Sequence, residues 1–349
     1  MKNGRLKMGA VALSLFLALV LVLSACGGGG GSQSGAEGSQ SGAAAEGSGE
    51  GGKDLIKLRV AYNKNGGQTP QYVAGTKGFF EKHGLSVERI EFKTNTDSVA
   101  ALESGDLDIM ASIPSNVWIA REAGFDIVAF MQNETAGTET PNSGALIVGA
   151  ESGIKEPKDL AGKKIACLSL GSQDCLDMVY VLEKAGVPRD SYTIIESTFA
   201  THYDLLKNKQ VDAVESVDPF TTLITKDGVG EVLFYTYIES NPDQPLGAWW
   251  AKREWVESNP EIVEKFSLAI KDAIDYLHED EQRARDIVAE YTGLDPNIVK
   301  EMPMLKWNYE LDIDAWQKEA EILVEVGGLK GVPDPKDYFA EAIHQYQVK

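Results

Sequence analysis

The chain has 349 residues, of which 43% are apolar and 25% are charged, enough for two domains with cores of their own. Acidic residues outnumber basic ones by 53 to 33, for a formal net charge of −20, and basic side chains form no cluster after residue 54. This argues against a nucleic-acid partner, because phosphate contacts need grouped Lys and Arg side chains.

The first 25 residues have the pattern of a lipoprotein signal peptide. Three basic side chains precede an apolar run from 8 to 23, which is short for a stable membrane span. The run ends in LSAC (23–26), a lipobox, which predicts cleavage before Cys26 and acylation of its thiol. A plain signal peptide with an incidental Cys is the alternative. Residues 26–54 are mostly Gly, Ser, Ala, Gln and Glu and predict a flexible tether that holds the protein on the outer face of the membrane.

The first half of the remaining chain alternates strand-like and helix-like segments. The expected strands are 55–62, 86–92, 108–113 and 125–132, and the expected helices are 70–84, 98–105 and 115–124. A polar turn, NKNGGQTP, separates the first strand from the first helix, and Pro70 suits the first turn of that helix.

The second half repeats this alternation and then becomes helical. Strands are expected at 143–152, 163–170, 192–197 and 211–217, with helices at 173–186 and 201–209 and another from Pro219. Residues 230–256 look strand-like and cross back to the first half. The last hundred residues predict helices at 258–280, 280–293, 295–303 and 312–327, whose apolar faces are packing surfaces.

One pattern occurs twice, at 102–116 and at 206–220. In each copy a helix-like stretch ends at a polar turn, and a short apolar strand then leads to a small polar residue and another helix. The aligned pairs are Leu102 and Leu206, Asp108 and Asp212, Ser112 and Ser216, and Pro114 and Asp218. A second echo, 57–62 with 163–168, keeps the same order. The repeat predicts two α/β lobes, with ligand-binding loops at the carboxyl ends of the strands.

Sequence motifs of catalysis are missing. The chain has no HExxH, P-loop, GxSxG or CxxC motif, and its four His residues lie far apart. We therefore expect no enzyme activity, no cofactor and no metal site. Cys167 and Cys175 are the thiols left after Cys26, and the sequence leaves open whether they form a disulfide.

The remaining candidates are helix starts that the two-lobe arrangement directs at one cleft. They are Gln68 with Thr69, Ser115 with Asn116, Ser172 with Gln173, and Asp218 beside a fourth helix. Helix N-termini bind anionic groups through free N–H groups and a partial positive charge. The alternative for each residue is that it only caps its own helix.

The chain resembles the solute-binding proteins of ABC importers, in the nitrate, sulfonate and taurine group that shares its fold with thiamine-precursor binders. The resemblance covers residues 55–348. It rests on YVAGTKGFFEKHGL (72–85), ALESGDLDI (101–109), ASIPSN (111–116), GIKEPKDLAGKKIACLSLGS (153–172), VDAVESVDPF (211–220), SNPEIVEKFSLAIKDAIDY (258–276), YTGLD (291–295) and VPDPKDYF (332–339).

The resemblance implies a two-lobed, type II periplasmic-binding-protein-like α/β fold with a ligand in the cleft. The first lobe would contain 55–143 and 247–349, and the second 144–246. It also implies delivery of the ligand to an ABC permease and ATPase. Together with the lipobox, the resemblance leads us to expect a lipid-anchored monomer. Ligand-binding roles fall on Gln68, Ser112, Ser115, Asn142, Ser172, Gln173 and Asp218.

Two positions that are often aromatic in relatives are Glu215 and Val217 here, while Trp249 supplies an aromatic ring elsewhere. A taurine-like sulfonate is the leading ligand, with its amino group held by Asp218 or Glu215. A planar ligand stacked on Trp249, such as a pyrimidine, flavin or aromatic acid, is the alternative. Two other classes are a tethered sensor or adhesin and an enzyme like the pyrimidine synthases of this fold, whose Cys-rich iron motif the chain lacks.

Overall fold

A computed structural model describes residues 55–92 and 95–341, which belong to one compact unit. The predicted signal peptide, the tether and Cys26 lie outside the described residues. Within the described part, no helix is both long and apolar enough to cross a membrane.

The first sheet contains strands from both ends of the described chain, in the order β11-β4-β10-β3, and an isolated parallel bridge between Val60 and Ile109 joins the β1-β2 pair to it. Its strands are β1 (Ile56–Tyr62), β2 (Leu85–Glu91), β3 (Met110–Ser112), β4 (Ile127–Thr135), β10 (Pro245–Lys252) and β11 (Lys306–Trp307). Strands β10 and β11 run antiparallel to β4, and β10 is also antiparallel to β3.

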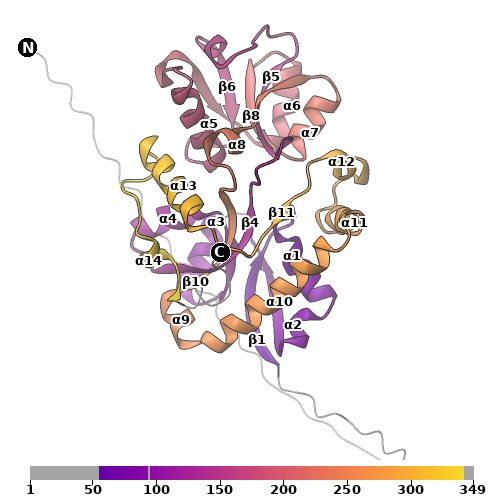
Figure 1. Ribbon diagram of the computed structural model, residues 1–349, viewed down its shortest axis with the longest axis vertical. Helices are drawn as coiled ribbons and strands as arrows, with labels where there is room; N and C mark the ends of the chain where they lie inside the picture. Colours follow the sequence, from indigo (N-terminus) through magenta and orange to yellow (C-terminus); the bar gives the residue numbers. More distant parts are fainter. Residues whose placement is uncertain (1–54, 93–94, 342–349) are drawn as a thin grey trace, which may run out of the picture. The chain divides into compact units, whose positions relative to one another are not determined.

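Helices cover both faces of this sheet (Figure 1). Those on the side of Phe130 and Trp249 include α1 (Thr69–Thr76), α2 (Phe79–Lys82), α10 (Pro260–His278), α11 (Glu281–Thr292) and α12 (Pro296–Glu301), and those on the side of Trp250 include α3 (Asn95–Ser104), α4 (Pro114–Glu122), α13 (Ile313–Glu325) and α14 (Pro335–Tyr338). A short helix, α9 (Arg253–Ser258), follows β10, and a 3₁₀ turn, η1 (Gly66–Gln68), precedes α1.

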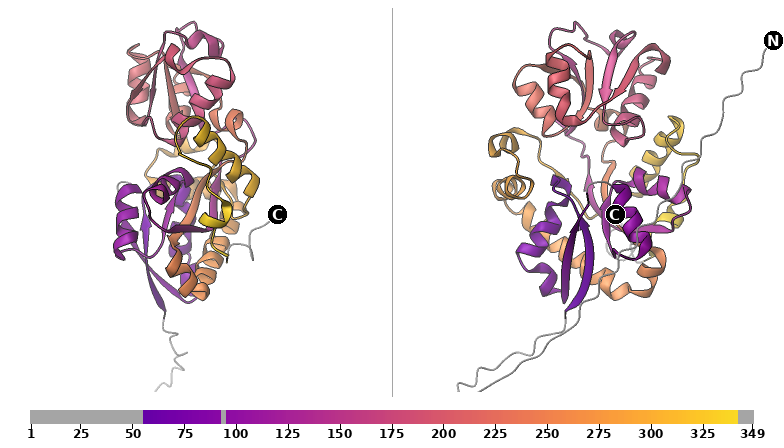
Figure 2. Two further views of the ribbon diagram at one scale, coloured as in Figure 1. Left: turned by 90° about the vertical axis from the view of Figure 1, so that its left-hand side faces the viewer. Right: turned by 180° about the vertical axis from the view of Figure 1, so that it is seen from behind.

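The second sheet contains five strands in the order β7-β6-β8-β5-β9, and Figure 2 shows helices on both of its faces. Its strands are β5 (Gly144–Gly149), β6 (Lys164–Cys167), β7 (Thr193–Glu196), β8 (Ala213–Val217) and β9 (Gly230–Phe234). Its helices are α5 (Gln173–Lys184), α6 (Phe199–Lys207), α7 (Phe220–Lys226) and α8 (Thr236–Ser240), with 3₁₀ turns η2 (Pro157–Leu160) and η3 (Arg189–Ser191).

Two segments connect the sheets. Residues 136–143 run from β4 to β5, and residues 241–244 run from α8 to β10. We propose that this division of strands marks the two lobes, 55–143 with 247–349 and 144–246. The strand β10 begins at Pro245, two residues before the expected boundary. Ion pairs also join helices of the second sheet to helices of the first, as in Lys184 of α5 with Glu325 of α13 and Lys226 of α7 with Glu301 of α12.

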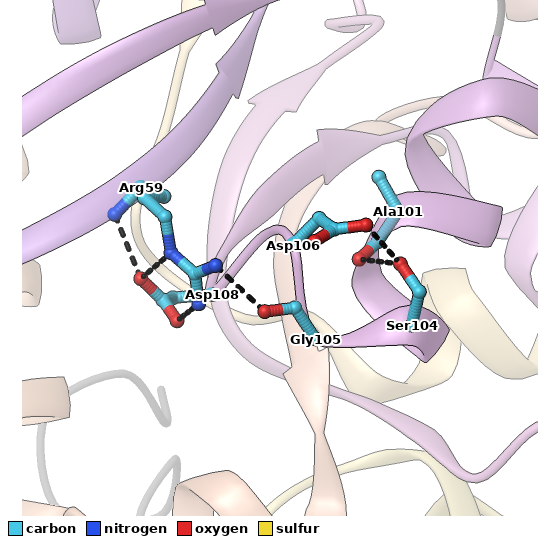
Figure 3. A network of polar contacts seen from close by, with 6 residues as sticks. All are labelled: Arg59, Ala101, Ser104, Gly105, Asp106 and Asp108. Atoms are coloured by element: carbon cyan, nitrogen blue, oxygen red, sulfur yellow. Dashed lines mark hydrogen bonds and ion pairs between the residues drawn. The ribbon is translucent and has the colours of Figure 1, made fainter.

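The repeated pattern performs the same structural task in both sheets. Asp108 accepts hydrogen bonds from the backbone N–H and the guanidinium of Arg59, at 2.7 Å to the backbone nitrogen, which fixes the turn before β3 to β1 (Figure 3). In the second copy, Asp212 accepts the backbone N–H of Lys164 at 2.9 Å, and fixes the turn before β8 to β6. In both copies a residue with positive φ precedes this turn, Gly105 in the first and Lys209 in the second.

Several elements differ from the sequence expectation, among them the following. The helix expected at 70–84 is divided because Gly78 adopts a φ of 73°, which ends α1 and starts α2. Residues 236–240 form a helix, α8, where a strand was expected. The two-residue strand β11 was not predicted, because it exists only through its pairing with the end of β4.

Gly230→Ala should destabilise the second sheet. A Cβ atom there would lie 2.6 Å from Ile147 Cγ2 and 2.8 Å from the carbonyl oxygen of Val148. We expect a loss of about 1–3 kcal/mol in the free energy of unfolding, because the contact with backbone cannot relax by a rotamer change. Denaturant unfolding measures this loss.

Gly75→Ala is the matched control, since its Cβ would meet no atom within 4 Å and the residue lies inside α1. It should raise stability by about 0.5–1 kcal/mol. Equal effects of the two substitutions would contradict the close packing of Gly230.

Candidate functional site

The directions of the strands place the predicted binding loops on two connected edges. In the first sheet, the carboxyl ends of β1, β3 and β4 share one edge with the amino end of β10, since β10 is antiparallel to β3 and β4. In the second sheet, the carboxyl ends of β6, β7, β8 and β9 share an edge with the amino end of β5. Both connecting segments join these two edges, and ligands of such open sheets bind beyond the carboxyl ends of the strands, so these edges are the candidate binding site.

On the edge of the first sheet, the predicted residues differ in what they do. Gln68 is buried and braces the turn after β1, because its Oε1 accepts the backbone N–H of Asn63 at 3.0 Å. Ser112 ends β3 and Ser115 lies in the first turn of α4. Both side chains are buried, and neither hydroxyl has a hydrogen-bond partner among the described residues. Buried hydroxyls without a partner are uncommon in proteins, which makes both of them candidates for a ligand contact.

On the edge of the second sheet, Ser172 and Gln173 begin α5. The Ser172 hydroxyl donates to the Ser169 carbonyl at 2.8 Å, so it also shapes the loop before the helix. Gln173 is buried, and its Nε2 donates to the carbonyl of Pro245 at 3.3 Å, across to the start of β10. Its Oε1 has no partner in the described part of the chain.

Asp218 follows β8, and one of its two carboxylate oxygens is bonded to the helix that follows, α7. Its Oδ1 accepts the backbone N–H and the hydroxyl of Thr222, at 3.0 and 2.5 Å. Its Oδ2 is buried, with no partner that the structure describes. Burial raises the pKa of Asp218 to about 6, and the two hydrogen bonds from Thr222 partly oppose that rise.

Asn142 lies in the first connecting segment and holds that segment in shape. Its Nδ2 donates to the carbonyl of Ala136 at 2.6 Å, and its Oδ1 accepts the backbone N–H of Gly144. Asn142 also lines a cavity of about 420 Å³ beside this segment, together with residues of α11 and of the stretch before β11. Its role toward a ligand stays a proposal.

The structure corrects the expectation for Trp249. The ring is completely buried and packs edge-on against Phe266 of α10, with 5.1 Å between ring centroids. Neighbouring residues on a strand point to opposite faces, and both faces of β10 are covered. Trp249 therefore belongs to the core of the first sheet, and its ring offers no stacking surface in this structure.

Glu215 is also too deeply buried to contact a ligand in this structure. It is completely buried in β8, where its Oε2 accepts the hydroxyl of Thr236 at 2.8 Å. Burial, reinforced by the nearby charge of Asp174, raises the pKa of Glu215 well above its usual range. The side chain faces the layer of α5 and α8 beneath the cleft.

Sequence reasoning missed the residues at the end of β4, Asn133, Glu134 and Thr135. The strand expected at 125–132 continues to Thr135 and carries these polar side chains to the same edge as Ser112. Glu134 and Thr135 line the 420 Å³ cavity with Asn142. The sequence contains a signal that could have identified them. Three polar residues follow an apolar strand directly, at its carboxyl end, where Ser112 was also expected to bind.

The two thiols of the second sheet are in contact. Cys167 ends β6, Cys175 lies in the first turn of α5, and a hydrogen bond joins their sulfur atoms at 2.6 Å. Both are free thiols in this structure. The hydrogen bond with Cys167, together with burial, raises the pKa of the Cys175 thiol. Across the described residues, no group of three His, Cys, Asp or Glu side chains is arranged to hold a metal ion.

Comparisons with known proteins agree with this architecture. The family model described as NMT1/THI5 like matches residues 65–284. A protein of Brucella abortus named as a binding protein is 29% identical over 82% of this chain and 91% of its own length. The taurine-binding periplasmic protein of Escherichia coli is 24% identical over 80% of this chain and 74% of its own. The crystal structure of the aliphatic sulphonate binding protein SsuA from Escherichia coli matches with a TM-score of 0.71, at 18% identity, over 83% of this chain and 99% of that one. The expected two-lobed, periplasmic-binding-protein-like fold is thereby confirmed.

Proposed function

The chain belongs to the NMT1/THI5-like family, and we propose on that basis that it is the solute-binding component of an ABC importer. It captures a small organic anion between the two sheet edges and delivers it to a permease that an ATPase drives. The leading ligand is a taurine-like aminosulfonate. The relatives named for taurine and for aliphatic sulphonates support this ligand class.

The observation that carries the proposal is the set of unpartnered polar groups on the two connected edges. Among the described residues, the hydroxyls of Ser112 and Ser115 near the start of α4 and the amide oxygen of Gln173 at the start of α5 have no partner. The starts of α1, α4 and α5 add unsatisfied N–H groups and a partial positive charge. Sulfonate oxygens need hydrogen-bond donors of this kind, and the ligand's own donors satisfy the amide oxygen.

The ligand's amino group distinguishes an aminosulfonate from nitrate or a plain sulfonate. Asp218 supports its recognition, since one carboxylate oxygen is tied to Thr222 and the other is buried without a partner in the described part. The planar alternative loses its main support, because Trp249 lies in the core.

Cellular placement follows from the proposed role. The protein works on the outer face of the cytoplasmic membrane, tethered through acylated Cys26 and the 26–54 segment. It acts as a monomer, because one chain supplies both walls of the cleft.

Ser115→Ala should weaken taurine binding about fivefold, which corresponds to the roughly 1 kcal/mol of one hydrogen bond. The stability of the ligand-free protein should not fall, because the hydroxyl has no protein partner in the described residues. Isothermal titration calorimetry gives the affinity, and thermal unfolding gives the stability.

Ser191→Ala is the control, since Ser191 lies at the opposite edge of the second sheet and its hydroxyl donates to the Pro188 carbonyl of its own turn. It should leave affinity unchanged. Absence of heat with every alkanesulfonate, beside tight binding of a ring compound, would replace the aminosulfonate by the planar ligand.

A further inference from the structure

Glu134 is an acid without a counter-charge at the edge of the proposed cleft. It occupies the end of β4, is partly exposed, and lines the 420 Å³ cavity. Among the described residues, no hydrogen bond or ion pair to its carboxylate is found, and burial alone raises its pKa to about 7. A carboxylate in such surroundings favours a positively charged partner.

The carboxylate lies close to the loop after β1. A Cβ atom on Gly67 would lie 2.2 Å from Glu134 Oε2, so the carboxylate reaches the backbone of this loop. The neighbouring Asn133 fixes the same loop, since its Nδ2 donates to the Gly67 carbonyl at 2.8 Å. The Nε1–H of Trp307 donates to the carbonyl of Gly66 at 3.1 Å. Glu134 is therefore positioned at the turn that leads into α1, beside Gln68.

The other charges of the cavity are already used. Arg285 is paired with Glu281 and also donates to the carbonyls of Val299 and Met302, and Lys306 pairs with Asp243. His278 and the exposed Glu139 complete the charged and titratable side chains of this cavity wall. None of the cations among them pairs with Glu134 in the described structure.

A second group in the same cavity also lacks a partner. Thr135 lines the cavity and is only 5% exposed. Its Oγ1 has no hydrogen-bond partner that the structure describes. An acid and an unpartnered hydroxyl that line one cavity offer acceptors that suit an N–H-rich cation.

We propose that Glu134 binds the cationic nitrogen of the solute, with Thr135 beside it, and thereby selects solutes that carry an ammonium or amidinium group over plain anions. The inference rests on the proposed function, because it concerns the same solute. Glu134 adds to the acid expected from sequence. Asp218 keeps one oxygen for the same amino group and gives the other to Thr222, whereas Glu215 is completely buried and bonded to Thr236.

Glu134→Gln in the full chain tests this with the matched pair taurine and ethanesulfonate, which differ by the amino group. We expect at least a tenfold loss of taurine affinity and no change for ethanesulfonate. Glu139→Gln, on the exposed side of the same cavity, should change neither. Wild-type affinity for taurine should rise from pH 6 to pH 8, because the carboxyl of Glu134, with a pKa of about 7, becomes ionised. The variant should keep only the smaller rise that comes from Asp218, whose pKa is about 6.

The stability of the ligand-free variant gives a readout that needs no ligand. If Glu134 is an unpaired acid kept for a solute, Glu134→Gln should melt at or above the wild-type temperature at pH 8. A lower melting temperature would overturn the inference, because it would show that the carboxylate makes contacts that stabilise the fold. Equal losses for taurine and ethanesulfonate would overturn it as well.

Failure of the proposed ligand is distinguishable from failure of Glu134. If wild type binds neither sulfonate, the pairs β-alanine with propionate and aminomethylpyrimidine with methylpyrimidine replace them. If Glu134→Gln then loses affinity only for the amino-bearing member of a pair, the result supports the inference. The same result shows that the solute in the proposed function is not a sulfonate. Wild-type binding of only the members without an amino group, in any pair, overturns it.

Discussion

Trp316→Ala should lower the free energy of unfolding by about 3–5 kcal/mol, the range for removing a buried large aromatic side chain. Trp316 is 1% exposed in α13 and touches four other rings. The partners are Trp118, Trp250, Tyr338 and Phe339, with centroid distances from 4.8 to 5.9 Å. Its indole N–H donates to Gln132 Oε1 at 2.6 Å, so the substitution also removes this buried hydrogen bond.

Urea unfolding followed by circular dichroism measures the loss. Ile119→Ala is the control, because Ile119 lies on the neighbouring helix α4 but is 43% exposed. It should cost less than about 0.5 kcal/mol, as surface substitutions usually do. A Trp316→Ala loss below about 1 kcal/mol would show that α13 and α14 contribute little to the fold.

Glu319→Gln should remove a pH dependence from the stability of the protein. Glu319 of α13 and Asp177 of α5 are both completely buried and face each other, one from a helix of the first sheet and one from a helix of the second. Gln244 donates to Asp177 Oδ2 at 2.7 Å, and Asn241 donates to Glu319 Oε2 at 3.3 Å, so the second connecting segment holds both acids.

The charges around this pair favour protonation. Burial raises the pKa of Glu319 to about 7, against smaller opposing effects that include its hydrogen bonds and Lys318. Burial also raises the pKa of Asp177, and the charges of Glu319, Asp174 and Glu215 add to that rise. One proton shared between the two carboxyl groups gives each of them a hydrogen-bond partner.

The sign of the pH effect follows from these raised values. In the unfolded chain Glu319 ionises near its ordinary value of 4.5, whereas in the folded protein it keeps its proton up to about pH 7. Its contribution to stability is complete below pH 4.5 and is lost as the pH rises to 7, by a total on the order of 3 kcal/mol. At pH 8, Glu319→Gln should therefore exceed wild type by about 1–3 kcal/mol, because the amide donates to Asp177 without bearing charge.

Denaturant unfolding at pH 5, 6, 7 and 8 checks the slope. Glu325→Gln serves as the control on the same helix, since Glu325 is 49% exposed and pairs with Lys184. Its effect should stay below about 1 kcal/mol at every pH. A variant at position 319 with the wild-type pH slope would contradict the shared proton.

Local patterns in the sequence determined the elements and their repetition. The alternation of apolar residues, the caps and the turn residues are short-range signals, so most strands and helices could be predicted. The repeated turn that contains Asp108 and Asp212 also predicted that each half carries its binding loops at the carboxyl ends of its strands, since strand direction follows from chain order in such units.

Only the tertiary structure decided what each side chain at those loops does. Trp249 and Trp250 are adjacent in sequence, but the covered faces of β10 put both rings into the core. Strand β11 exists through its pairing with β4, and Gly66 and Gly67 bring the loop after β1 against Leu305 and Glu134. Whether an acid is paired, capping or free depends on neighbours far away in the chain. Glu134, Asp218 and Glu319 are therefore alike as acids in the sequence, and burial and long-range contacts make them different in the fold.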